Sequence, residues 1–215
     1  MSDSEKSLER WFVAYPQAQP GRTRGVVFDR SGRHLLLWRR AHSTIAMLDT
    51  YTRQNPTRLQ LREPINFALS HPLTDQFMLF ERQGTRALRP GTNSIGPLKR
   101  LPGPAEVGDY DERGNLIALV GKQWIMQRHK QDRWQPHSKA PEIFLKRADR
   151  GVLVAQLGWF IISLYDEVRA WQANGTEIEL PFGRSHHKPT IAVDQDREFL
   201  LVGWGPEGTA RLDLI

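Results

Sequence analysis

The chain has 215 residues, of which 39% are hydrophobic and 25% charged, and this balance excludes a disordered polymer. It has no cysteine, which excludes disulfide bonds and thiolate metal sites. Lys and Arg outnumber Asp and Glu by 30 to 24, which gives a basic protein, and no apolar run reaches the roughly 18–20 residues that a membrane helix needs.

The N-terminal segment MSDSEKSLER (residues 1–10) is polar and mixed in charge, so we expect a flexible tail rather than a signal peptide. Without an export signal, a cytoplasmic and bacterial protein is the expected setting. The next segment, WFVAYP (residues 11–16), has the character of a single strand. It resembles no neighbouring segment and lies outside all the repeats that follow.

Five short apolar strands follow in chain order, and each precedes a second, alternating strand. They begin at His34, Gln76, Asn115, Phe160 and Glu198, so consecutive copies are 38 to 45 residues apart. Each copy is introduced by another strand and a turn rich in Asp, Gly, Ser or Pro, which reverse a chain at low cost. The period is typical of the ~40–45 residues of a β-propeller blade.

A fourth strand completes each of the first four copies, at TRLQLR, GPLKRLP, EIFLK and TEIELPF. The sequence therefore predicts one all-β domain over residues 11–215, a five-bladed β-propeller with four-stranded antiparallel blades. The predicted blades span residues 25–63, 64–104, 105–146, 147–188 and 189–215, the last completed by residues 11–16. That N-terminal strand would close the ring and remove exposed sheet edges. A β-sandwich is the alternative, but it does not explain the period.

The turn-plus-strand units DRSGRHLLLW, DERGNLIALV and DQDREFLLVGW resemble the WD-type β-propeller repeat family. The resemblance lies in the pattern of strand and turn and covers nearly the whole chain from Trp11. It implies a scaffold that binds other proteins on its faces. It implies no catalytic residue.

Asp29, Asp111 and Asp194 stand at or near the end of the first strand in three copies. Paired carboxylates would suit glycoside hydrolysis, but Asp in this position commonly caps the following turn. His186 and His187 are adjacent, and adjacent side chains on an extended segment point apart, so they would not share a metal ion. We therefore predict no catalytic residue, no cofactor and no metal site.

The seven tryptophans divide by position in the repeat. Packing between blades is expected for Trp38, Trp159 and Trp204, and half-exposed third-strand positions for Trp124 and Trp171. Trp134 lies in a polar, basic segment, QDRWQPHSK, which is typical of an interface hot spot. Basic side chains accumulate in the first two copies. The predicted partner-binding residues are Arg39, Arg40, Arg82, Arg86, Arg89, Arg100, Arg133 and Trp134, with Lys99 beside them.

These observations predict a non-catalytic scaffold or accessory subunit of a bacterial multiprotein assembly, binding another protein through a propeller face. The alternative is a nucleic-acid-binding accessory subunit, motivated by the pI of about 9.9 and the excess of arginine. A carbohydrate-binding propeller is a further alternative, motivated by the tryptophans.

Overall fold

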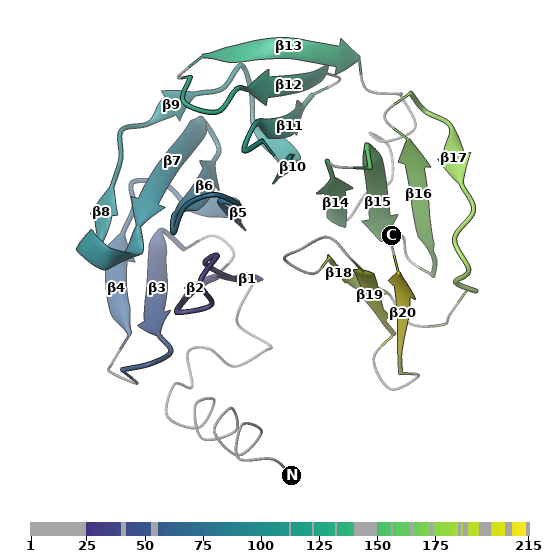
Figure 1. The fold of residues 1–215 in the computed structure, drawn as a ribbon, viewed down its shortest axis with the longest axis horizontal. Helices are drawn as coiled ribbons and strands as arrows, with labels where there is room; N and C mark the ends of the chain where they lie inside the picture. The colour runs from purple at the N-terminus through teal and green to yellow at the C-terminus, as the bar shows by residue number, and fades with distance from the viewer. Residues whose placement is uncertain are drawn as a thin grey trace. The chain divides into compact units, whose positions relative to one another are not determined.

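The protein is all-β, as the sequence predicts, and its strands form five antiparallel sheets in a computed structural model (Figure 1). The structure describes residues 25–39, 42–52, 56–111, 113–121, 123–131, 133–139, 150–155, 157–163, 166–172, 174–184, 186, 189–193, 199–204 and 208–213. None of these residues forms a helix long and apolar enough to cross a bilayer.

Each sheet is a run of consecutive strands in chain order. The first contains β1 (Gly25–Phe28), β2 (His34–Trp38), β3 (Thr44–Asp49) and β4 (Thr57–Gln60). The second contains β5 (Ile65–Ser70), β6 (Phe77–Glu81), β7 (Gly84–Arg89) and β8 (Ser94–Ile95), with β9 (Lys99–Arg100) paired to β7 and a 3-10 turn at Pro90–Thr92.

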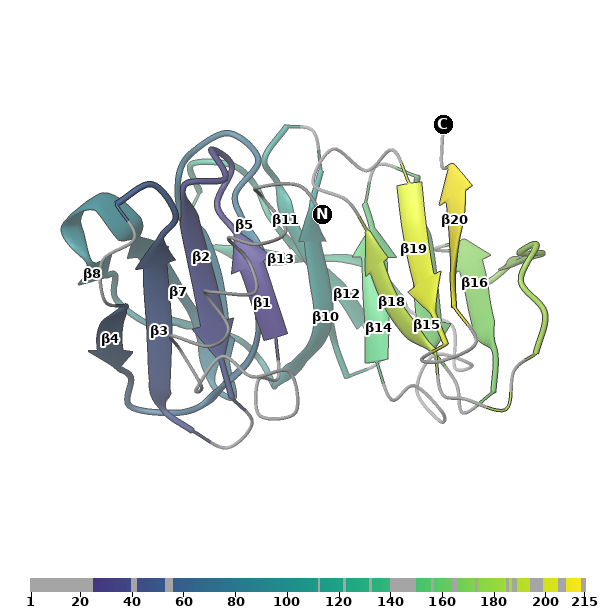
Figure 2. The same cartoon turned by 90° about the horizontal axis from the view of Figure 1, so that it is seen from below.

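The remaining sheets follow the same plan. The third contains β10 (Ala105–Tyr110), β11 (Leu116–Val120), β12 (Gln123–Gln127) and β13 (Trp134–Lys139). The fourth contains β14 (Arg150–Val154), β15 (Trp159–Ser163), β16 (Val168–Gln172) and β17 (Glu177–Ile178). The fifth contains β18 (Thr190–Val193), β19 (Phe199–Gly203) and β20 (Thr209–Asp213) within the described residues. Figure 2 shows the strands of the first sheet in the order β4, β3, β2 and β1.

The second strand of a sheet is the most apolar because it has a neighbour on each side and packing on each face. Every residue of β6 is buried. Side chains from consecutive sheets form the core: one cluster joins Leu36 and Ile45 of the first sheet to Phe77 and Leu79 of the second. Comparable clusters join the third sheet to the fourth and the fourth to the fifth. Burial of these faces supplies the main driving force for folding.

The third sheet departs from the sequence prediction. Its fourth strand is β13, which pairs with β12, whereas the predicted strand EIFLK lies outside the described residues. Trp134 therefore begins a strand rather than lying in a loop. Pro136 within β13 obscured this strand in the sequence, but proline is tolerated on the outermost strand of a sheet. The ladder also shifts register between Trp124 and Ile125.

The exposure of two tryptophans also differs from the sequence prediction. Trp124 and Trp171 are each only 2% exposed and lie in one core cluster with Phe160, so the prediction that they are half exposed is wrong. Trp38 packs between the first and second sheets, as predicted.

The chain divides into two compact units, Met1–Leu98 and Lys99–Ile215. The first and second sheets pack together within the first unit through their shared core cluster. The third to fifth sheets lie within the second unit. The predicted strand at residues 11–16 lies outside the described residues.

Candidate functional site

The segment between β4 and β5 connects two hairpins of the first unit by hydrogen bonds. Gln60 Nε2 donates to Ser43 Oγ at 2.6 Å, and the Leu61 N–H donates to the Ser43 carbonyl at 2.8 Å. On its other side, Gln83 Nε2 donates to Glu63 Oε1 at 2.9 Å. The β2–β3 and β6–β7 hairpins therefore meet at one end of the first two sheets. We call this end the linked edge, made of residues 42–43, 60–63 and 81–83.

Two arginines project from the linked edge. Arg62 and Arg82 are exposed, and within the described part of the chain neither forms an ion pair. Arg39 follows β2 directly and is half-buried at the same end of the first sheet. A guanidinium group offers several donors in a fixed plane and stays charged, so this edge can bind carboxylates or phosphates.

Beneath these arginines lie two carboxylates. Glu81 is 1% exposed, and its Oε1 accepts a hydrogen bond from Arg86 Nε at 2.8 Å. Arg86 also donates from Nη1 to the Gly96 carbonyl at 3.2 Å. Burial raises the pKa of Glu81, the Arg86 charge opposes this shift, and the nearby Glu63 charge adds to it. The Glu81 carboxyl therefore has Arg86 as a fixed partner.

The two carboxylate oxygens of Glu63 differ in their hydrogen bonding. Its Oε1 accepts from Gln83, but its buried Oε2 has no hydrogen-bond partner among the residues that the structure describes. A buried acceptor without a partner costs free energy, which a donor on a bound molecule would recover. The linked edge thus combines exposed donors on Arg62 and Arg82 with one free carboxylate oxygen. Within the described residues no group of three or more His, Asp or Glu side chains could hold a metal ion.

The structure separates the predicted basic residues. Arg82 lies at the linked edge, whereas Arg89 is exposed at the other end of β7. Arg86 is committed to Glu81 and Gly96, so its charge is largely neutralised inside the first unit. Lys99 and Arg100 form β9, and Arg133 and Trp134 lie at the start of β13 in the second unit. Arg40 lies outside the described residues. The partner-binding role of these residues stays a prediction.

Sequence reasoning missed Arg62, Glu63, Glu81 and Gln83. A signal was present, because the segments LREP and ERQG each place an Arg–Glu or Glu–Arg pair where a strand ends. What the sequence does not reveal is that the two segments are neighbours, since this depends on how the second sheet packs against the first.

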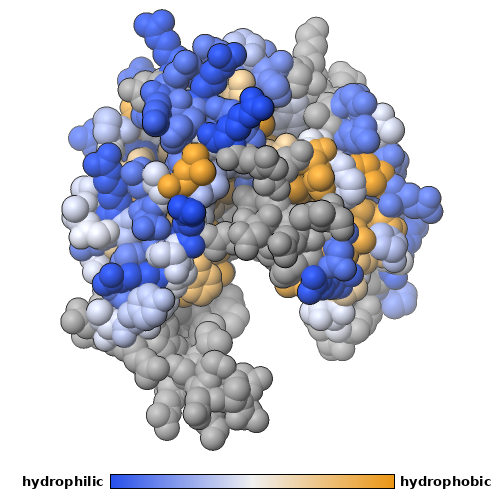
Figure 3. All heavy atoms as spheres, in the orientation of Figure 1, coloured by the Kyte–Doolittle hydropathy of each residue, from blue (hydrophilic) through white to orange (hydrophobic). Residues whose placement is uncertain are grey.

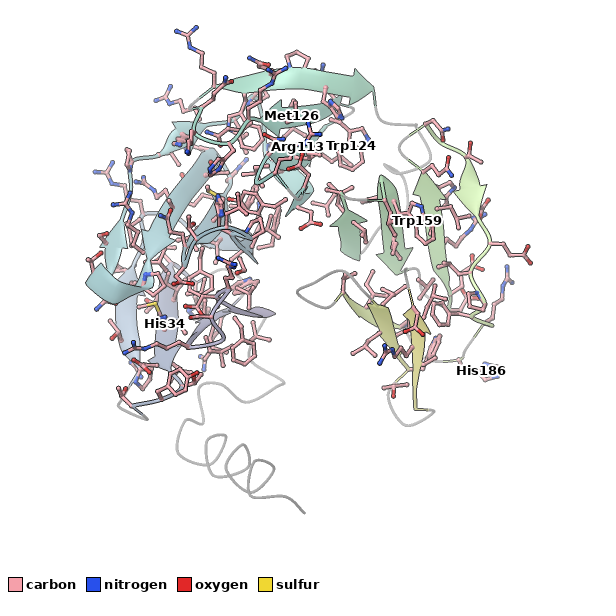
Figure 4. All side chains as sticks on the ribbon, in the orientation of Figure 1. His34, Arg113, Trp124, Met126, Trp159 and His186 are labelled. Carbon is pink, nitrogen blue, oxygen red and sulfur yellow. The ribbon has the colours of Figure 1, made fainter. Side chains whose placement is uncertain are left out.

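The aspartates considered for catalysis cap turns instead. Asp29 is fully buried and its Oδ1 accepts from the His34 N–H at 3.0 Å, while its Oδ2 lies 2.7 Å from His34 Nδ1 (His34 is labelled in Figure 4). Asp111 accepts from the backbone N–H groups of Arg113 and Asn115. Asp194 and His187 lie outside the described residues, and His186 is exposed.

Hydrophilic side chains dominate the face of the first unit that Figure 3 displays. All six tryptophans that the structure describes are buried or half-buried. No described indole ring therefore offers a largely exposed face on which a sugar could stack.

Fold and site together define an all-β protein built of successive antiparallel sheets, with a polar edge on its first two sheets. No family model and no curated protein matches the sequence. Among solved structures the chain is similar to a chain of "Kuenenia stuttgartiensis Hydrazine Synthase", with a TM-score of 0.61 and 10% identity. The similarity covers 89% of this chain and 64% of that one, so this chain spans less than two thirds of its neighbour. In all, 626 solved chains match, and such a widespread fold does not select a function.

The prediction that the protein is not an enzyme is corrected by this comparison. A chain of similar fold belongs to hydrazine synthase, which is an enzyme. The fold therefore gives no ground for excluding catalysis, and the implication drawn from the repeat resemblance was too strong. At 10% identity the likeness concerns the fold alone.

Proposed function

We propose that the protein is an interaction subunit of a multiprotein assembly and binds an acidic segment of another protein at the linked edge. The observation that carries this proposal is the pair of exposed arginines, Arg62 and Arg82, neither of which forms an ion pair with another residue that the structure describes. Hydrogen bonds already hold both hairpins, so binding would order few groups and lose little conformational entropy.

The test is affinity purification of the tagged protein from its native host, with the co-purifying protein identified by mass spectrometry. The variant Arg62→Glu/Arg82→Glu should lose that protein, because two attractive charges become repulsive. Arg113→Glu/Arg128→Glu, which reverses two exposed charges of the second unit, is the matched control and should retain it. Equal recovery with all three proteins would contradict the linked edge as the binding site.

Nucleic acid binding is the second candidate, favoured by the net charge of +6 and the exposed Arg62 and Arg82. It predicts a mobility shift with single- or double-stranded oligonucleotides that weakens steeply as salt rises. Absence of a shift at low salt would eliminate this candidate. The carbohydrate alternative has no comparable support, because no described tryptophan is exposed.

We also propose that the five sheets are the blades of a five-bladed, WD-like propeller, with residues 11–16 pairing with β20 to complete the fifth. Three strands of that sheet lie among the described residues, one fewer than in the first and fourth sheets. The first sheet offers apolar side chains for a neighbour to cover: Val26 is 55% and Phe28 47% exposed. A cytoplasmic location remains part of the proposal.

A further inference from the structure

At the other end of the first sheet, a tyrosine stands on a turn. Tyr51 follows β3 and is 74% exposed, the largest value among the exposed large hydrophobic residues of the described chain. Its side chain makes no hydrogen bond or ring contact within the part of the chain that the structure describes.

The backbone beneath Tyr51 is held by a single carboxylate. Asp49 Oδ1 accepts from the N–H groups of Tyr51 and Thr52, at 2.9 and 3.1 Å. Asp49 Oδ2 accepts from Arg33 Nε at 3.0 Å and from Arg33 Nη2 at 2.9 Å. Both oxygens of one side chain thus fix the turn that carries the tyrosine.

A second pair of hydrogen bonds joins this turn to the β1–β2 turn. The Thr50 N–H donates to the Arg33 carbonyl at 2.7 Å, and Thr50 Oγ1 donates to the Gly32 carbonyl at 3.1 Å. The two turns form one surface, which we call the Tyr51 platform: residues 30–33 and 49–52. A tyrosine on a fixed backbone can bind with little loss of entropy, because only two side-chain torsions become restricted.

The charges of the platform indicate what kind of partner it would bind. Arg30 is exposed and has no ion-pair partner among the described residues. The Arg33 side chain is 49% exposed and forms an ion pair with Asp49. Tyrosine and arginine are, with tryptophan, the side chains enriched at the energetic centres of protein interfaces. A complementary partner would present an apolar pocket for the ring and a carboxylate for Arg30.

We propose that the Tyr51 platform is a second docking site, which inserts Tyr51 into an apolar pocket of a protein partner that has carboxylates at its rim. The platform and the linked edge lie at opposite ends of β3, which spans Thr44–Asp49. At ~3.3 Å per residue they are separated by about 17 Å. The two proposed sites are therefore separate surfaces of the first sheet.

The test selects random peptides displayed on phage against the full-length protein and measures the affinity of the enriched synthetic peptides by fluorescence anisotropy. Enriched peptides should combine Asp or Glu with apolar residues. Tyr51→Ala should weaken their binding by roughly tenfold or more, the scale of an interface hot spot. Arg30→Ala should weaken it less, because a charge at the rim contributes less than a buried ring. An unchanged melting temperature would show that both variants fold.

Two controls separate this site from the proposed function. Arg62→Glu/Arg82→Glu should leave the affinity of these peptides unchanged, since it alters only the linked edge. Leu73→Ser, which removes another exposed apolar side chain on a turn of the second sheet, should also leave it unchanged. Selection that yields no peptide sensitive to Tyr51→Ala overturns the platform as a docking site, whatever the linked edge binds.

Discussion

At the residue scale, one carboxylate after the first strand organises the turn to the second in two of the sheets. Asp29 and Asp111 accept backbone N–H groups of the residues that follow, and Gly32 and Gly114 adopt a positive φ within these turns. The same residue types could have indicated a carboxylate pair for hydrolysis. Their repetition indicates a structural role instead, because each turn needs its own cap.

The hydrogen-bonded pair of Asp49 and Arg33 makes the stability of the protein depend on pH. The hydrogen bond from Arg33 lowers the pKa of Asp49 from 3.8 to about 2, so the folded state favours the ionised carboxylate. The stabilisation is complete above pH 3.8 and is lost as the pH falls towards about 2. Asp49→Asn should flatten the decline in the free energy of unfolding over this window, measured by urea denaturation at each pH. Salt should weaken the effect, because the pair is partly exposed.

Asp75→Asn is the control for this titration, since Asp75 is exposed and makes no ion pair within the described residues. Its unfolding curves should follow those of the unaltered protein across the same window. Identical pH profiles for Asp49→Asn and the unaltered protein would show that the Arg33 pair does not contribute to stability.

Gly25 offers a second prediction at this scale. A methyl group added to Gly25 would overlap the indole ring of Trp38, its cross-strand partner. Trp38 is part of the core between the first two sheets and would be displaced from it. Gly25→Ala should therefore destabilise the protein by about 1–3 kcal/mol, measured by urea denaturation. Gly91→Ala is the control, because nothing lies within 4 Å of the added atom. Equal stability of the two variants would be evidence against tight Trp38 packing.

At the scale of elements, the sequence predicted the second and third strands of each sheet and the fourth strands β4 and β17, whereas it missed β13. The inner strands bury both faces, so their sequences are runs of apolar residues, as in β6 and β11. A fourth strand has one neighbour and needs little hydrophobicity, which is why the polar segment of β13 escaped prediction. The linked edge escaped for a related reason: its residues come together only through packing between sheets.

Alanine substitutions of Trp124 and Trp134 compare an inner strand, β12, with an outer strand, β13. Trp124 is 2% exposed and meets Phe160 edge to face with ring centroids 5.8 Å apart, whereas Trp134 is half-buried. Trp124→Ala should cost about 3–5 kcal/mol in the free energy of unfolding, because it leaves a large cavity. Trp134→Ala should cost less, since less of its surface leaves water on folding. A chemical denaturation series compares the two variants. The reverse order would contradict the assignment of Trp124 to the core.

At the scale of the whole molecule, the period in the sequence predicts how many sheets form and in what order. It says much less about how a ring would close, because closure depends on segments from the two ends of the chain. The closure proposal needs residues 11–16 to form a strand. Within the first unit, the exposed face of β1 supplies the apolar surface that a closing sheet would cover.

If the ring closes, the contribution of the exposed β1 face to stability should depend on the presence of residues 11–16. In the full-length protein, Phe28→Ser should lower the free energy of unfolding by about 1.5 kcal/mol or more, because the fifth sheet would cover the ring of Phe28. After deletion of residues 1–16 the fifth sheet would lack its outer strand and release this face. The same substitution should then cost under about 0.5 kcal/mol, as expected for an exposed site. Chemical denaturation of the four proteins completes the double-mutant cycle. If the two changes in the free energy of unfolding were additive, closure would be contradicted. Additivity would mean that the β1 face is equally exposed with and without the N-terminal strand.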